Sequence, residues 1–121
     1  MISAPFVVPL NPVFSQTIRT TLGGQACRIN VYTKHIWVPQ EAAIVTDPPV
    51  FAAIDPIFLD LYVDDVLVIG GVLCLNRVNI VRDAYLGFVG DLSFADLQAD
   101  EDPRTDGLGS RWILAYWPNL Q

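Results

Sequence analysis

The sequence predicts an all-β fold, either a small β-sandwich or a partly open barrel built from hairpins, with long irregular loops. Three observations lead to this prediction. Nine prolines and eight glycines in 121 residues disfavour long helices. Several short segments alternate apolar and polar residues with a period of two, which is the pattern of a half-buried strand. Glycine or aspartate pairs separate some of these segments, as tight hairpin turns require.

Length and composition predict a single β domain over residues 1–121 that has its own core. Apolar residues make up 52% of the chain, which excludes global disorder. Charged residues make up only 17%, below the roughly 25% of an average soluble domain, and the mean hydropathy is +0.39. We therefore expect some apolar surface to face a partner. The net charge of −6 argues against binding to nucleic acid.

Segments for targeting or membrane insertion are not evident. No run of 18 apolar residues lacks a charge, a proline or a glycine pair, so we expect no membrane-spanning helix. The start of the chain lacks the basic and apolar regions of a secretory signal, and we expect synthesis in the cytoplasm. Cys27 and Cys74 fit no zinc spacing and are expected to be buried, reduced thiols. A Cys27–Cys74 disulfide is the less favoured alternative.

The first hairpin is predicted from segments 14–22 and 25–33, which flank the Gly23–Gly24 pair. A two-residue turn sets the register, in which Ile18 meets Ile29 on the inner face. The alternating pattern is consistent with this register on both strands.

The same register places Arg19 opposite Arg28 on the outer face. Like charges that lie directly opposite each other destabilise a sheet. Either both side chains extend into water, or the pair meets an acidic surface of a neighbouring subunit.

Residues 36–56 are predicted to be an irregular excursion with short strand pieces. Prolines interrupt the segment, yet its apolar content is too high for a freely solvated loop. It must pack either on its own domain or on a neighbour.

A second hairpin is predicted from segments 57–63 and 66–69 around Asp64–Asp65. Its two-residue turn sets four pairs: Val63–Val66, Leu61–Val68, Tyr62–Leu67 and Asp60–Ile69. Both faces are mostly apolar, which is typical of strands covered on both sides. In so small a domain another chain can supply the second cover, so Tyr62 and Leu67 are candidate contact residues.

The rest of the chain is predicted as short strands joined by loops. Gly70–Gly71 indicates a break or bulge before the strand resumes. The remaining segments are a helical turn or connector at 76–83, a strand at 92–95, a polar loop at 98–110 and a last strand at 111–117.

No catalytic or metal-binding pattern stands out. His35 is the only histidine, and no glycine-framed nucleophile accompanies it. The acidic loop 100–106 fails the EF-hand pattern because Arg and Thr stand where that loop needs an oxygen ligand and a glycine. We expect a solvated turn there, with an irregular cation site as the alternative. The prediction is therefore no enzyme, no metal and no cofactor.

The last strand places Trp112 and Tyr116 on one face and Trp117 on the other. Core filling accounts for one face, which leaves the other as a candidate contact surface because aromatic residues concentrate at interface centres. A ligand-stacking platform made by these three side chains is the alternative.

Leu108 stands between two glycines, which indicates a sharply bent backbone. The leucine is expected to fold back onto its own core. The alternative is that the loop presents Leu108 to a neighbouring subunit, with Arg104 and Arg111 meeting acidic residues around it.

Several strings resemble the small baseplate plug proteins of contractile-tailed bacteriophages. They are Tyr-Leu-Gly-Phe-Val-Gly-Asp-Leu-Ser-Phe-Ala-Asp at 85–96 and Asp-Pro-x-x-x-Gly-Leu-Gly-Ser-Arg-Trp-x-Leu-x-Tyr at 102–116. Asn-Pro-x-Phe-Ser at 11–15, Leu-Gly-Gly at 22–24, Leu-Asp-Leu-Tyr at 59–62 and Ile-Gly-Gly-Val at 69–72 occur in the same order in that family. The resemblance covers about residues 9–118.

The resemblance implies a non-enzymatic virion component of the tail baseplate. It implies a plug or adaptor where the tail tube meets the central hub and spike, helping to close the lumen until contraction. The implied partners are tube, hub, spike or wedge subunits and copies of the chain itself. Alternatives are another tube-end or hub completion protein, or a stand-alone β-sandwich that binds a ligand. The candidate subunit-interface residues are Arg19, Arg28, Tyr62, Leu67, Leu108, Arg111 and Trp117.

Overall fold

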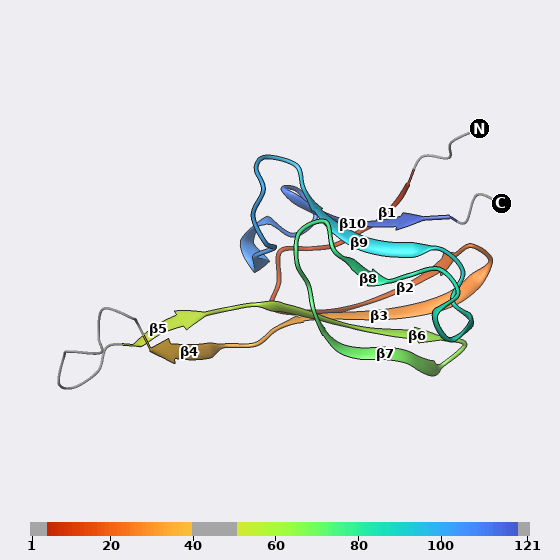
Figure 1. Cartoon of the computed structure of the whole chain (residues 1–121), viewed down its shortest axis with the longest axis horizontal. Coiled ribbons are helices and arrows are strands. Elements are labelled where there is room, and N and C mark those ends of the chain that lie inside the picture. The colour runs from red at the N-terminus through yellow and green to blue at the C-terminus, as the bar shows by residue number, and fades with distance from the viewer. Residues whose placement is uncertain (1–4, 40–50, 119–121) are drawn as a thin grey trace.

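The computed structural model describes residues 5–39 and 51–118, which form a two-layer β-sandwich and a projecting arm (Figure 1). Sheet A has the order β1 (Phe6–Val8), β10 (Trp112–Trp117), β9 (Asp91–Asp96) and β8 (Asn79–Val81). Sheet B has the order β2 (Ser15–Leu22), β3 (Gln25–Thr33), β6 (Ile57–Val63) and β7 (Val66–Leu73). All strand pairs within the two sheets are antiparallel. The predicted all-β fold is confirmed as a sandwich.

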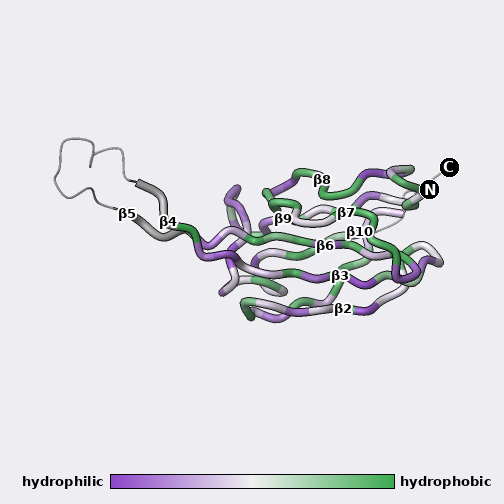
Figure 2. The backbone as a smooth tube through the Cα atoms, turned by 90° about the horizontal axis from the view of Figure 1, so that it is seen from below, coloured by the Kyte–Doolittle hydropathy of each residue, from purple (hydrophilic) through white to green (hydrophobic). Residues whose placement is uncertain are grey.

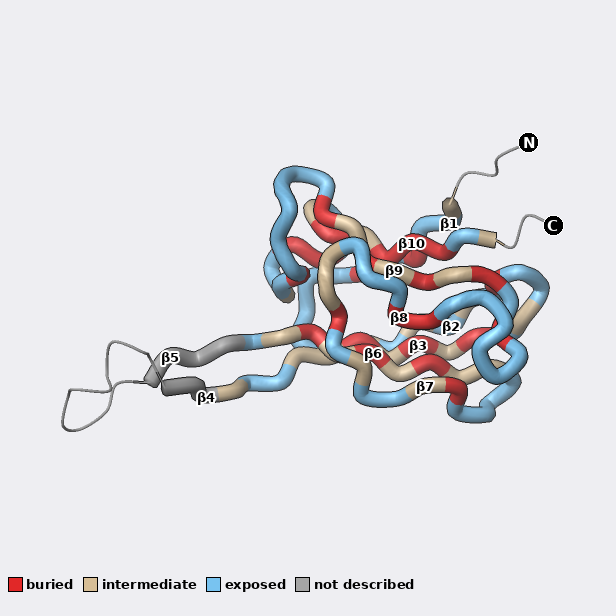
Figure 3. The backbone as a smooth tube through the Cα atoms, in the orientation of Figure 1, coloured by how far each residue is buried: buried red, intermediate tan, exposed pale blue. Residues whose placement is uncertain are grey.

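The hydrophobic core lies between the two sheets (Figure 3). Alternate residues of β3 and β6 point inward, among them Ile29 and Leu61, and the same alternation on β9 and β10 buries Phe94 and Leu114. Burying a side chain of this kind stabilises the fold by roughly 1.5–3 kcal/mol relative to leaving it exposed. The period of two in the sequence thus determines which face of each strand meets the other sheet.

The first hairpin has the predicted register. All of β2 pairs with β3 around the Gly23–Gly24 turn, and Ile18 faces Ile29. Both glycines have positive φ, +57° and +78°, which a type I′ hairpin turn requires of its two central residues.

The second hairpin follows the prediction only next to its turn. Val63 faces Val66 and Tyr62 faces Leu67, as predicted. Further along, the predicted Leu61–Val68 and Asp60–Ile69 pairs are wrong, because register shifts set Leu61 opposite Ile69.

The register changes at two places: Val68 is an extra residue between the Tyr62–Leu67 and Leu61–Ile69 pairs, and a second shift follows at Gly70–Gly71. The backbone N–H of Gly71, at φ +65°, donates to the Asp60 carboxylate over 2.7 Å. At this second shift a side chain takes the place of a ladder bond, and β7 bulges out at Gly70–Gly71, as predicted from the glycine pair.

The arm continues the two central strands of sheet B. It consists of β4 (Ile36–Pro39) paired with β5 (Phe51–Ile54), and Figure 1 shows it extending from one end of the sandwich. Thr33 faces Ile57 in the sheet and Ile36 faces Ile54 in the arm, so both pairs of strands share one register. The predicted strand pieces in 36–56 are confirmed in part, and residues 40–50 lie outside the described residues.

Two further strands differ from the sequence prediction. The segment 76–83 contains β8, so the helical-turn alternative was wrong there, and β1 was not predicted at all. Both are three-residue edge strands of sheet A, too short to show a periodic pattern. The two cysteines are free and buried, as expected, and burial raises the pKa of the Cys74 thiol to about 12.

Candidate subunit-contact surfaces

The outer face of sheet B is covered by no other described element. In Figure 1 sheet A lies on its other side, and Figure 2 shows β2, β3, β6 and β7 side by side from below. One row across this face consists of Arg19, Arg28, Tyr62 and Leu67, which are direct cross-strand partners in that order. We call these four residues the basic row. It contains four of the seven predicted interface residues.

The charges of the basic row are only weakly countered within the described residues. The Arg28 guanidinium lies 4.1 Å from the centre of the Tyr62 ring, a cation–π contact. Its Nη1 is 3.7 Å from the exposed Asp65 carboxylate, and its buried Nε has no hydrogen-bond partner there. Arg19 is exposed and makes no ion pair in that part of the chain. Leu67, at the other end of the row, is 51% exposed.

A second row of the same face is aromatic and satisfied internally. Tyr32 stacks on Phe58 with ring centres 6.1 Å apart, and the Lys34 amine lies 4.5 Å from the Phe58 ring centre. The Tyr32 hydroxyl donates to Asp60 over 3.0 Å. Burial, together with this bond to a carboxylate, raises the pKa of Tyr32. This row packs tightly without a partner, unlike the basic row.

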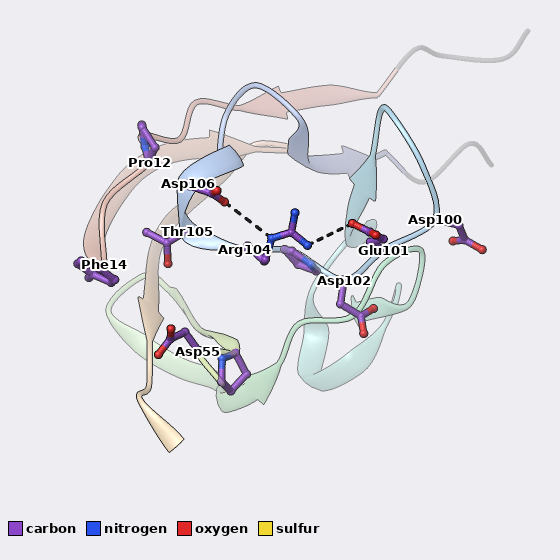
Figure 4. A pocket seen from close by; sticks show the side chains of 11 residues that line it. Pro12, Phe14, Asp55, Asp100, Glu101, Asp102, Arg104, Thr105 and Asp106 are labelled. Atoms are coloured by element: carbon purple, nitrogen blue, oxygen red, sulfur yellow. Dashed lines mark hydrogen bonds and ion pairs between the residues drawn. The ribbon is translucent and has the colours of Figure 1, made fainter. Parts of the chain in front are cut away.

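An acidic hollow lies at the base of the arm (Figure 4). It encloses about 940 Å³ between the loop 100–106, the start of β2 and the end of the arm. Its lining comprises Pro12, Phe14, Asp55, Pro56, Asp100, Glu101, Asp102, Pro103, Arg104, Thr105 and Asp106. Five carboxylates and one guanidinium give a formal charge of −4. Phe14 adds an apolar edge that is 70% exposed.

Hydrogen bonds hold the carboxylates of the hollow in place. Asp100 accepts from the Asn76 side chain over 2.6 Å, and Asp102 accepts from the Asn76 backbone N–H over 2.9 Å. Arg104 is paired with Glu101 at 3.1 Å and with Asp106 at 3.9 Å. Asp100 and Asp102 therefore have neutral donors but no cation within 4 Å in the described part of the chain.

A buried ion pair fixes the loop that carries these acids. Arg111 binds the fully buried Asp96 carboxylate through two nitrogens, each at 2.9 Å, and reaches Glu101 at 2.7 Å. Asp96 also accepts from the backbone N–H groups of Gln98 and Glu101. The Arg111 hydrogen bonds hold the pKa of Asp96 well below its usual range, and Asp96 in turn raises the pKa of Arg111.

Three residues of the same loop region contact the Trp112 side chain. The guanidiniums of Arg104 and Arg111 lie 4.8 Å and 4.3 Å from the centre of its ring, and its indole N–H donates to the Glu101 carbonyl oxygen over 3.1 Å. The predicted polar loop 98–110 is thus tied to the core through Trp112, while residues 97–102 are exposed to solvent, as expected.

Three of the seven predicted interface residues, Leu108, Arg111 and Trp117, lie outside the basic row. Leu108 is 2% exposed and lies in the core cluster, and the Arg111 guanidinium is occupied by Asp96 and Glu101. Trp117 is 42% exposed, at the end of β10 in sheet A and away from the basic row. Trp112 and Tyr116 are buried, so they form no ligand-stacking platform with Trp117.

Sequence reasoning missed the acidic hollow and the Asp96–Arg111 pair. Asp96 occupies an inward position of β9. An acid at an apolar position of an alternating strand is a usable signal for a buried partner, because such a charge requires one. No local sequence pattern indicates that Phe14, Asp55 and Asp102 are neighbours, because they come together only through the topology of the fold.

Within residues 5–39 and 51–118, no three His, Cys, Asp or Glu side chains form a group suited to a metal ion. The same residues contain no helix with the length and apolar character to cross a membrane.

Comparison with known proteins identifies the family. A search of curated proteins finds no match to this chain. The model of the family described as cyanophage baseplate Pam3 plug gp18 matches residues 6–119, which includes every strand of both sheets and the arm. This agrees with the resemblance in the strings at 85–96 and 102–116. The chain belongs to the family of cyanophage baseplate plug proteins, with a structural role in the phage tail baseplate.

Proposed function

We propose that the protein is the plug or adaptor at the junction of the tail tube and the central hub and spike, acting by subunit contacts and not by catalysis. The arm is the observation that carries the proposal. Its two strands pair only with each other among the described strands, and an isolated two-stranded ribbon is marginally stable in water. A ribbon of this kind gains stability by packing on a neighbour.

The arm is well placed to reach another subunit. It extends beyond the sandwich, while its base remains joined to the central strands of sheet B (Figure 1). At this base the Lys34 N–H donates to the Pro56 carbonyl oxygen over 3.2 Å, and His35 Nδ1 lies 2.6 Å from the Asp55 carboxylate. These cross-strand contacts orient the arm relative to the body.

Lys34 allows a direct test, because it is the only lysine in the chain and is exposed at the arm's base. Amine-reactive crosslinking of purified phage particles, followed by mass spectrometry, should join Lys34 to tube and hub or spike subunits. A Lys34→Arg variant keeps the charge and removes this reactive amine, so these crosslinks should disappear while incorporation stays normal. Crosslinks confined to sheath or outer wedge subunits would contradict the junction position.

The role of the arm is tested by shortening it. A variant in which a tight two-residue turn replaces residues 37–53 should keep the melting temperature of the body, because residues of both sheets and of the loops between their strands form the core of the sandwich. We expect this variant to be missing from assembled particles. Normal incorporation and infectivity would refute a contact role for the arm.

A further inference from the structure

The basic row and the acidic hollow are complementary surfaces of one chain. The basic row offers two guanidiniums beside Tyr62 and an exposed leucine. The hollow offers a formal charge of −4 beside the exposed ring of Phe14. Each surface therefore combines charge of one sign with an exposed apolar side chain, and the two charges are opposite in sign.

The basic row is electrostatically incomplete in the isolated chain. Arg19 and Arg28 face each other directly across two strands, which is unfavourable for like charges. The Asp65 carboxylate lies 3.7 Å from Arg28, but it is itself exposed, and it forms no ion pair with Arg19 among the described residues. Carboxylates from outside would relieve this repulsion, and a guanidinium binds them with two parallel hydrogen bonds.

The hollow has the opposite excess. Its single guanidinium, Arg104, is already paired with Glu101 and Asp106. Asp100 and Asp102 are held by Asn76, a neutral residue, so their charges are oriented but not neutralised. A cation that enters the hollow can therefore bind Asp100 and Asp102, whose carboxylates are already in position. It does not have to break an ion pair of either residue.

The two surfaces of one chain cannot meet each other. Tyr62 of the basic row lies near one end of β6, and Pro56 of the hollow lies just before its other end. Six residues of extended strand separate them by about 20 Å. The charges can be matched only between two molecules.

We propose that the basic row of one copy docks on the acidic hollow of a second copy, so that copies of this chain associate head to tail. Such a contact uses two different patches, and therefore generates a closed ring or a continuing chain of subunits. It requires only this protein, so it stands or falls independently of the position proposed above. Because the matched charges lie at the surface, the association weakens as salt rises.

The first experiment measures the association state of the purified full chain by sedimentation velocity in 50 mM and 500 mM NaCl. We expect species larger than a dimer at low salt, and at least tenfold weaker association at high salt. Arg19→Glu makes the Arg19–Arg28 pair neutral and should weaken association at least tenfold at low salt. The matched control is Arg82→Glu, which makes the same change in net charge at an exposed residue outside both surfaces. It should associate like the unchanged chain.

The second experiment tests the head-to-tail arrangement by mixing. Asp100→Lys combined with Asp106→Lys makes the hollow formally neutral and leaves the basic row intact. This variant and Arg19→Glu should each be monomeric alone. Mixed, they retain one intact row and one intact hollow, so they should form a one-to-one dimer and nothing larger.

Circular dichroism and thermal melting first confirm that each variant is folded, and Arg19→Gln replaces Arg19→Glu if the latter is not. A monomeric unchanged chain at low salt would overturn the proposal and assign the two surfaces to other subunits. Equal weakening by Arg19→Glu and Arg82→Glu, or a mixture that stays monomeric, would overturn it as well.

Discussion

Replacing Leu108 by alanine tests whether the loop at 97–111 is held by the core. Leu108 is 2% exposed, and its N–H donates to the Thr105 carbonyl oxygen over 3.3 Å. The glycines on either side permit this position. A Cβ at Gly107 would overlap the Trp112 ring, so the backbone approaches that ring closely only because no side chain intervenes.

The magnitude follows from the burial of Leu108. A fully buried leucine replaced by alanine costs about 2–5 kcal/mol, the lost transfer free energy plus a cavity term. With a midpoint of about 3.5 kcal/mol, and about 4 °C per kcal/mol for a chain of this size, the melting temperature should fall by about 14 °C. Thermal unfolding followed by circular dichroism measures this shift.

The matched control is Leu97→Ala, the same substitution in the same loop at a side chain that is 60% exposed. It should change the melting temperature by only a degree or two. Leu108→Asp should destabilise more than Leu108→Ala, because it adds a buried charge without a partner. If Leu108→Ala melts like Leu97→Ala while its incorporation into particles fails, the core role is refuted and an interface role takes its place.

Three further sets of substitutions test the bent loop, the buried ion pair and the two thiols. Gly109→Ala should lower the free energy of unfolding by more than about 1 kcal/mol, because φ there is +86° and a Cβ would overlap a backbone carbonyl oxygen. Arg111 lowers the pKa of Asp96 from its ordinary 3.8, so the pair stabilises the fold above about pH 4 and this stabilisation is lost as pH falls below it. Unfolding measured from pH 2 to 7 should therefore show a weaker acid dependence for Asp96→Asn. Cys27→Ala and Cys74→Ala should each cost about 1 kcal/mol by denaturant unfolding, and alkylation of both thiols should be slow until the chain unfolds.

The first hairpin was predictable because its information is local. Period-two alternation on both sides of Gly23–Gly24 fixes the face of each strand, and the turn length fixes the register. The opposition of Arg19 and Arg28 follows directly. The second hairpin has the same kind of pattern but departs from it at two bulges. The first lies between Tyr62 and Leu61, where Val68 is the extra residue, and the second lies where the Asp60 side chain binds the Gly71 N–H. The glycine pair indicated the second bulge, whereas the first leaves no trace in the apolar pattern.

The acidic hollow was not predictable because its residues are scattered along the chain. Phe14 precedes β2, Asp55 ends the arm, and Asp102 belongs to a loop after β9. The sandwich topology alone brings them together. The loop itself was predicted as polar, but its anchoring depends on Asp96 and Arg111, which stand 15 positions apart and meet only because β9 pairs with β10.

The shared register of the arm and sheet B determines how a contact at the arm reaches the fold. β3 and β6 are the two central strands of their sheet, and both contribute fully buried residues such as Ile29 and Leu61 to the core. The cross-strand contacts at Lys34–Pro56 and His35–Asp55 connect this core to the arm without a change of register. A force applied at the arm is therefore passed along paired strands into the two central strands of sheet B, and not into an edge strand or a loop. This anchoring supports the contact role proposed for the arm.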